Sequence, residues 1–174
     1  MPVIVRSAVE TDIEAITAIY AHHVRYGTGT FETEPPDRFE MAGRWREVNA
    51  NGLPWLVAED DSEIVGYAYA SPYRARVAYR YTVEDSVYVR VDRLGAGLGR
   101  LLLPTLILAT QACGMRQMIA IIGDSGNQAS IRLHRSFGFR DAGLLKDVGF
   151  KFGQRLDTVF MQRDLDGSSA VPHS

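Results

Sequence analysis

VEDSVYVRVDRLGAGLGR, residues 83–100, joins a strand to an apolar helix through a glycine-rich loop and is the most informative part of this sequence. The glycines at positions 95, 97 and 99 leave the backbone free of side chains where the helix begins. Because a helix N-terminus carries unpaired N–H groups and partial positive charge, this loop is suited to hold a pyrophosphate. Glu84 lies on the strand that leads into the loop, so the pattern indicates a phosphate-bearing cofactor used in proton chemistry.

Two nucleotide-binding motifs with similar glycine loops are excluded by their spacing. The dinucleotide motif G-x-G-x-x-G would place its third glycine at position 100, which is Arg100, and the P-loop pattern G-x-x-x-x-G-K-[ST] is absent. A glycine-rich turn from strand to helix without any ligand remains as the alternative. The neighbouring motifs are therefore needed to distinguish a pyrophosphate-binding loop from a turn without a ligand.

Length and composition indicate one soluble globular domain. The chain has 174 residues, 46% of them hydrophobic and 23% charged, which is enough to bury one core. We expect a domain over residues 1–166 and a polar tail over residues 167–174. The formal net charge of −2 argues against a general nucleic-acid binder. The longest apolar run, residues 101–109, is far shorter than the ~20 residues of a membrane span, so no membrane partner is expected.

Cysteine usage and the N-terminus bear on the compartment. The single cysteine, Cys113, excludes an internal disulfide and fits a reducing environment. Residues 1–6 show no signal-peptide pattern, so we expect a cytoplasmic protein. Cys113 ends an apolar helix and is expected to be a buried structural thiol rather than a nucleophile.

Hydrophobic spacing and turn signals predict an alternation of strands and helices. The expected helices cover residues 11–26, 37–49, 98–112 and 127–137, and Pro104 should kink the third helix or shift its register. A basic, aromatic and extended connection is expected over residues 73–80. The expected strands cover residues 3–6, 55–59, 64–71, 83–91, 115–122, 139–150 and 157–164.

The chain contains seven blocks of sequence in this order: TFETEP (30–35), SPYRAR (71–76), AYRYTVEDSVYV (78–89), GDSGNQAS (123–130), LH (133–134), GF (138–139) and GFKFG (149–153). Together these blocks resemble the GNAT superfamily of acyl-CoA N-acyltransferases, within it the group acting on phosphinothricin, methionine sulfoximine and methionine sulfone. The resemblance spans Ile4 to Leu165. It implies an α/β (α+β) GNAT fold: a mixed central sheet of about seven strands, helices on both faces, and fourth and fifth strands that splay apart. Relatives of this kind are commonly homodimers.

The resemblance implies acetyl-CoA as cosubstrate and no metal. The pantetheine arm would lie between the splayed strands, and the pyrophosphate would rest on the glycine loop, in agreement with the interpretation of that loop as an anion site. The implied cofactor-binding residues are Val87, Tyr88, Val89, Gly95, Ala96, Gly97, Leu98, Gly99, Arg100, Asn127 and Ser130.

Two residues match catalytic positions of the family. Glu84 would be the general base that removes a proton from the substrate ammonium, and burial would raise its pKa toward neutrality. The alternative is a structural ion pair of Glu84 with Arg76 or Arg80. His134 stands where many relatives have a proton-donating tyrosine; it would protonate the leaving thiolate, or it would only contact the cofactor.

Substrate choice is expected from the basic connection and two flanking segments. Phosphinothricin carries a carboxylate and a phosphinate, and two anionic groups suit guanidinium partners. Arg74 and Arg76 alternate in a segment expected to be extended, so both would point to one face. A solvated basic loop is the alternative. The implied substrate-binding residues are Phe31, Glu32, Arg74, Arg76, Tyr79, Lys151 and Phe152.

Two departures from the family pattern stand out: Leu94 replaces a polar residue at the start of the loop, and Gln154-Arg155 replaces Arg-Trp in the closing hairpin. The resulting hypothesis is direct N-acetylation of a small amino-acid-like amine. The alternatives are acetylation of peptide or protein N-termini and a CoA-binding module without turnover.

Overall fold

Seven strands form one mixed sheet in the order β1-β2-β3-β4-β5-β7-β6. The computed structural model describes residues 2–167; residues 168–174 of the expected polar tail lie outside this range. β4 and β5 run parallel and all other neighbours are antiparallel, so the expected mixed sheet is confirmed. The strands are β1 (Ile4–Ser7), β2 (Trp55–Asp60), β3 (Glu63–Pro72), β4 (Thr82–Val89), β5 (Gln117–Gly123), β6 (Arg140–Lys151) and β7 (Gln154–Asp164).

Within residues 2–167, four α-helices cover the sheet: α1 (Ile13–Tyr26), α2 (Arg38–Ala50), α3 (Gly99–Ala112) and α4 (Gln128–Ser136). Side chains fix two of their starts. Asp37 accepts a hydrogen bond from the Glu40 N–H at 2.8 Å, and Asn127 accepts one from the Ser130 N–H at 3.3 Å. The third helix continues through Pro104 as one element.

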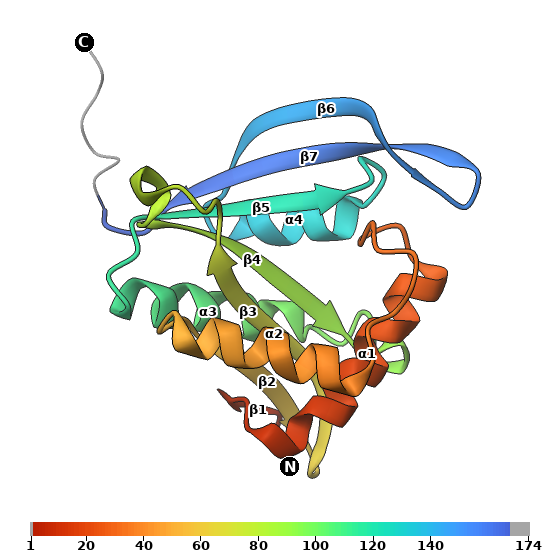
Figure 1. Ribbon diagram of the computed structural model, residues 1–174, viewed down its shortest axis with the longest axis vertical. Helices are drawn as coiled ribbons and strands as arrows, with labels where there is room; N and C mark the ends of the chain where they lie inside the picture. The colour runs from red at the N-terminus through yellow and green to blue at the C-terminus, as the bar shows by residue number, and fades with distance from the viewer. Residues whose placement is uncertain (1, 168–174) are drawn as a thin grey trace.

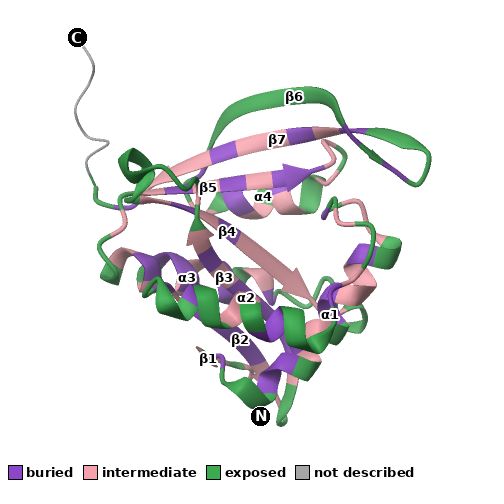
Figure 2. Ribbon diagram, in the orientation of Figure 1, coloured by how far each residue is buried: buried purple, intermediate pink, exposed green. Residues whose placement is uncertain are grey.

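The helices lie on both faces of the sheet, α1 and α2 on one and α3 and α4 on the other (Figure 1). Tyr20 of α1 packs edge-on against Tyr88 of β4. On the opposite face, Leu102 of α3 approaches Gly66 of β3 so closely that a Cβ there would lie 3.1 Å from it. The buried core therefore spans both faces of β2 to β5, while β6 is exposed along most of its length (Figure 2).

The fourth and fifth strands diverge after a short parallel ladder. Pairing runs from Thr82↔Gln117 to Asp85↔Ala120 and then stops. Beyond that point β4 stays paired with β3 as far as Val89, and β5 stays paired with β7 as far as Gly123. The expected splay is thus present, and a fork opens immediately after Asp85.

Three local expectations need correction. Residues 73–81 are not extended but bend through a short 3₁₀ turn at Val77–Tyr79, so strand alternation does not govern Arg74 and Arg76. Cys113 is exposed rather than buried: it caps the C-terminal end of α3, and its thiol donates to the Ala109 carbonyl of the same helix at 3.2 Å. β7 begins at Gln154, three residues earlier than expected. Within residues 2–167, no helix is long and apolar enough to span a bilayer.

Candidate active site

A cleft of about 550 Å³ lies at the fork between β4 and β5. Its walls come from residues 84–89 of β4, residues 120–122 of β5, residues 28–29 of the loop after α1, and the start and inner face of α4. The backbone of β4 has no partner strand on the side of the fork beyond Asp85, so its polar groups face the cleft. The cleft therefore offers strand-like hydrogen bonding to an extended ligand.

Glu84 lines this cleft at the base of the fork. Burial raises the pKa of Glu84 to about 7, the negative charge of Asp85 adds to the rise, and Arg74 opposes it. The ion pair with Arg76 or Arg80 considered above does not form: among the described residues, no cation pairs with the Glu84 carboxylate within 4.0 Å. A carboxyl group titrating near neutrality without an ion-pair partner is suited to general base chemistry.

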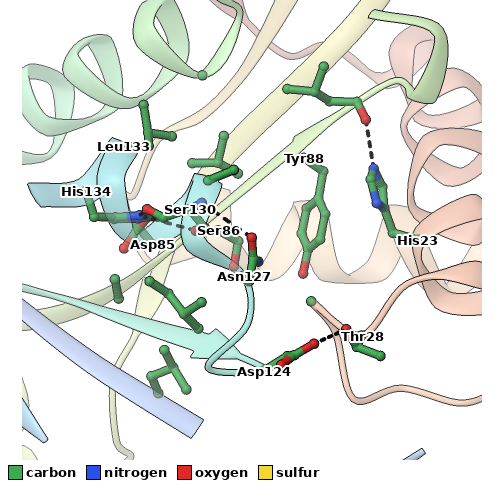
Figure 3. Close-up of a pocket in the computed structure, with 18 of the residues that line it drawn as sticks. His23, Thr28, Asp85, Ser86, Tyr88, Asp124, Asn127, Ser130, Leu133 and His134 are labelled. Atoms are coloured by element: carbon green, nitrogen blue, oxygen red, sulfur yellow. Dashed lines mark hydrogen bonds and ion pairs between the residues drawn. The ribbon is translucent and has the colours of Figure 1, made fainter. Parts of the chain in front are cut away.

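His134 reaches the cleft from α4 and is buried (Figure 3). Its Nε2 lies 2.7 Å from Oδ2 of Asp85, and its Nδ1 lies 2.8 Å from the carbonyl oxygen of Ser130. Burial alone would lower the pKa of His134, but the charge and hydrogen bond of Asp85 raise it overall. Both ring nitrogens are thus occupied by protein partners.

The side chains of Glu84 and Asp85 lie on opposite faces of the sheet. Side chains alternate along a strand, so Glu84 shares the α1 and α2 face with Tyr88, whereas Asp85 meets His134 on the α3 and α4 face. The negative charges of Glu84 and Glu32 both contribute to the raised pKa of Tyr69 on β3.

The glycine loop has the geometry of an anion cradle. Gly95 and Gly97 have φ of 79° and 81°, where other residues are strained, and a Cβ at either would meet only open space. In the described chain, the N–H groups of Gly97, Leu98 and Gly99 have no protein acceptor. A Cβ on Gly99 would lie 2.9 Å from Leu133, so α3 and α4 approach closely here. These features fit a diphosphate on the N-terminus of α3.

The expected cofactor residues divide into two groups. Val87, Tyr88, Val89, Gly99, Asn127 and Ser130 line the cleft. Gly95, Ala96, Gly97, Leu98 and Arg100 form the loop and first helical turn beside it. Arg100 lies over the ring of Phe137, and Arg93, which would be one substitute for the polar residue missing at Leu94, is paired with Asp60 at 2.8 Å. Backbone amides thus provide most of the cradle.

None of the seven expected substrate residues is among the described residues that line the cleft. Lys151 is buried and donates from Nζ to the carbonyl of Thr30 at 2.9 Å. Phe31 packs against Gly123 and Gly149, and Glu32 pairs with Arg44 at 2.8 Å. The other four are exposed: Arg74, Arg76, Tyr79 and Phe152.

Three polar contacts at the cleft were not predicted: His23 with Val89, Thr28 with Asp124, and Asp85 with His134. His23 donates from Nε2 to the Val89 carbonyl at 2.7 Å, which fixes the free end of β4 to α1. Thr28 donates to Asp124 at 2.7 Å and ties the first loop to the end of β5 (Figure 3). The face on which Asp85 lies could have been predicted, because side chains alternate along a strand and Asp85 follows Glu84 directly. The contacts of His23 and Thr28 could not, since their partners are distant in sequence.

Comparison with known proteins agrees with this architecture. Residues 16–139 match the acetyltransferase (GNAT) family. Phosphinothricin N-acetyltransferase from Alcaligenes faecalis is 56% identical over 169 residues, 97% of this chain and 86% of that protein. An L-methionine sulfoximine/L-methionine sulfone acetyltransferase from Pseudomonas aeruginosa is 43% identical over 172 residues, 97% of this chain and 98% of that protein.

A solved structure extends the comparison to three dimensions. The GNAT superfamily phosphinothricin acetyltransferase from Sinorhizobium meliloti, in complex with acetyl-CoA, is 45% identical and superposes with a TM-score of 0.93. The match covers 100% of this chain and 95% of that one. The family match, the sequence identities and the superposition agree, and this chain belongs to the GNAT family of acetyltransferases.

Proposed function

We propose that this enzyme transfers the acetyl group of acetyl-CoA directly to the α-amino group of a small amino acid that carries a second anionic or sulfoximine-like group. The observation that carries the proposal is Glu84: a carboxyl group at the fork of an acetyl-CoA-type cleft, without an ion-pair partner, with a pKa of about 7. The names of the relatives, phosphinothricin and methionine sulfoximine or sulfone acetyltransferases, support the substrate class.

The residues of the cleft divide the chemistry between them. The amides of residues 97–99 and the free edge of β4 hold the diphosphate and pantetheine of acetyl-CoA. Glu84 accepts one proton from the substrate ammonium, and the neutral amine then attacks the thioester carbon. The C–S bond breaks, and the thiolate takes the second proton of the amine nitrogen and leaves as CoA thiol. Because the described chain has a single cysteine, exposed at the end of α3, direct transfer is favoured over a cysteine-bound acetyl intermediate.

The acceptor side is proposed to be formed by the first loop, the basic connection and the β6–β7 hairpin. Arg74 acts electrostatically on Glu84, which supports its placement near the acceptor. An anionic tail on the substrate would find Arg74 and Arg76 on this side, with Tyr79 next to Tyr73. Phe31, Glu32 and Phe152 shape the pocket, and Lys151 supports it through Thr30.

Acetylation of peptide N-termini is the second candidate, and one contact argues against it. The hydrogen bond between Lys151 and Thr30 joins the hairpin to the loop after α1. This closure restricts the acceptor side and leaves less room for a chain that continues beyond the first residue. A CoA-binding module without turnover is disfavoured by Glu84. Its carboxyl group has a pKa of about 7 and no ion-pair partner among the described residues, so a purely structural role does not explain it.

An acceptor panel tests the proposal. Release of free CoA thiol from acetyl-CoA is followed with phosphinothricin, methionine sulfoximine, methionine sulfone, methionine, and a dipeptide that begins with methionine sulfone. We expect turnover with the first three at kcat/KM at least tenfold above methionine and the dipeptide. Release only with the dipeptide would favour the peptide enzyme. Binding of acetyl-CoA without release from any amine would favour the module.

We further propose one acetyltransferase domain over residues 1–166, a cytoplasmic location and a homodimer. The dimer is supported by β6, an edge strand whose residues 140–148 are all exposed. Apolar side chains on this strand, Leu144, Leu145, Val148 and Phe150, are each at least 49% exposed, which is unusual for a free surface. Sedimentation equilibrium measures the state directly, and a monomer at micromolar concentration would contradict the homodimer.

A further inference from the structure

The ion pair between Asp85 and His134 lies at the fork where β4 and β5 part. The side chains are 1% and 5% exposed, and the Nε2 to Oδ2 distance is 2.7 Å. A buried ion pair gains little net stability, because desolvation of both charges offsets their attraction. The second carboxylate oxygen of Asp85, Oδ1, is also buried and has no partner among the described residues. Stability alone therefore does not account for this pair.

The hydrogen bonds of the ring define the protonation of His134. The carbonyl of Ser130 can only accept, so Nδ1 carries a proton. Nε2 faces the Asp85 carboxylate, which also accepts, so Nε2 carries the second proton. With Asp85 ionised, both ring nitrogens face acceptors, and this arrangement favours an imidazolium whose two N–H groups already have protein partners; the Ser130 hydroxyl lies farther from Nδ1, at 3.4 Å.

The imidazolium lies across the strand from the proposed base. Glu84 and Asp85 are neighbours on β4 with side chains on opposite faces, and both Glu84 and His134 line the same cleft. A thioester held in the fork would thus have the carboxylate of Glu84 on one side and the positive charge of His134 on the other.

We propose that Asp85 is a positioning residue for acetyl transfer, which holds His134 at the fork as an imidazolium whose charge stabilises the CoA thiolate as it leaves. This inference rests on the proposed function. In the step, the amine nitrogen forms a bond to the carbonyl carbon, the C–S bond breaks, and its electron pair stays on sulfur. The nitrogen loses two protons in all: one goes from the ammonium to Glu84 before attack, and the other goes from the acylated nitrogen to the departing thiolate, which leaves as the CoA thiol. His134 keeps both of its protons.

The groups that contact the His134 ring identify Asp85 as the residue to substitute in a test. The ring meets β4 through Asp85, its own helix through the Ser130 backbone, and the edge of the Phe139 ring at 4.9 Å between centroids. Among these contacts Asp85 alone is titratable. Glu84 points to the other face of β4, and the Arg163 guanidinium is hydrogen-bonded to the Phe137 carbonyl nearby.

The first test uses the protein without ligand. Nitrogen-15 histidine NMR follows the titration of His134 in the wild type, in Asp85→Asn and in Asp141→Asn. Asp141 pairs with Arg135 on the exposed side of α4 and is the matched control. We expect His134 to be charged at pH 7 in the wild type and in the control, and to titrate at least one pH unit lower in Asp85→Asn. A neutral His134 at pH 7 in the wild type would overturn the proposal even if Asp85→Asn does not fold.

The second test reads the effect on sulfur. Ultraviolet absorbance measures the thiol pKa of bound CoA, which we expect to be lowered relative to free CoA in the wild type and restored in Asp85→Asn. The kcat of Asp85→Asn should fall roughly 10²-fold with the KM for acetyl-CoA changed less than threefold. Asp85 would have a merely structural role if the thiol pKa of CoA bound to the wild type equalled that of free CoA. The same conclusion would follow if Asp85→Asn lost kcat and acetyl-CoA affinity to the same extent. If no amine in the acceptor panel were acetylated, the proposed function would be refuted. The NMR titration of His134 and the thiol pKa of bound CoA would still test the role of Asp85 separately.

Discussion

Lys151 at the end of β6 donates a hydrogen bond to the carbonyl of Thr30, 121 residues earlier, over 2.9 Å. The ammonium is almost fully buried, and burial lowers the pKa of Lys151. The sequence predicts a substrate contact at this position. The structure gives Lys151 a different direct partner, the loop that carries Phe31 and Glu32, so its influence on the acceptor passes through that loop.

Lys151→Met should loosen the loop at Thr30 while acetyl-CoA binding is kept, because Thr28 in the cleft wall is still held by Asp124. Loss of a charge-assisted hydrogen bond should lower the free energy of unfolding by about 1–3 kcal/mol. The KM for the acceptor should rise severalfold while that for acetyl-CoA stays constant. Denaturant unfolding and steady-state kinetics measure both effects. Lys146→Met on the same strand, where the side chain is exposed, is the control; equal behaviour of the two variants would refute the role of the contact.

Gly149→Ala should displace Phe31. A Cβ at position 149 would lie 2.5 Å from Cε2 and 2.7 Å from Cζ of that ring, and a rigid ring cannot yield by a rotamer change alone. Overpacking of this kind lowers the stability by about 1–3 kcal/mol, and the acceptor KM should rise. Gly143→Ala on the same strand meets nothing within 4 Å and should leave both quantities unchanged. Thermal unfolding and acceptor kinetics that do not separate these two variants would contradict the packing argument.

Arg74→Met should move the pH dependence of the reaction. The positive charge of Arg74 lowers the pKa of Glu84, so its removal favours the protonated carboxyl and shifts the rise of kcat/KM to higher pH. The KM for an anionic acceptor should increase more than that for a neutral one. The control is Arg80→Met, whose guanidinium lies over Tyr81. An identical pH profile in Arg74→Met and wild type would show that the charge does not reach Glu84.

Glu84→Gln should make the protein more resistant to heat at alkaline pH. The pKa of Glu84 is raised in the folded state, so the unfolded chain ionises first and folding loses stability as the pH rises from about 4.5 to about 7. Removal of the carboxyl eliminates this loss. The variant should therefore melt above the wild type at pH 8.5 and together with it at pH 4, as measured by calorimetry. A lower melting temperature at pH 8.5 would indicate that the carboxylate stabilises the fold.

Local patterns in the sequence predict the elements and the centre of the site. The loop of residues 95–99 and Glu84 are local features, because a glycine spacing and a strand lead directly to them, and both lie where expected. Cleft contacts set by tertiary packing are not predicted in this way. Lys151 and Thr30 meet only because the hairpin folds back onto the first loop, and His23 reaches Val89 only because α1 crosses the end of β4.

Arg74 and Arg76 show a different limit. Their alternation would place them on one face only in a continuous strand, but β3 ends at Pro72 and the backbone bends at residues 73, 75 and 76. Asp85 shows the reverse case. Its alternation with Glu84 predicts that its side chain lies on the opposite face of the sheet. Its partner on that face, His134, could not be predicted in this way, because it lies on a helix 49 residues later in the sequence.

The pH dependence of kcat/KM in wild type and Glu84→Gln, with acetyl-CoA binding measured by calorimetry on the same samples, tests the role of Glu84 most directly. In the wild type the rate should rise with pH through about 7, as Glu84 loses its proton. In Glu84→Gln the rate should fall roughly 10²–10⁴-fold and lose this limb, with the Kd for acetyl-CoA unchanged. A variant that keeps the wild-type rate and the same pH limb would contradict the assignment of Glu84 as the base.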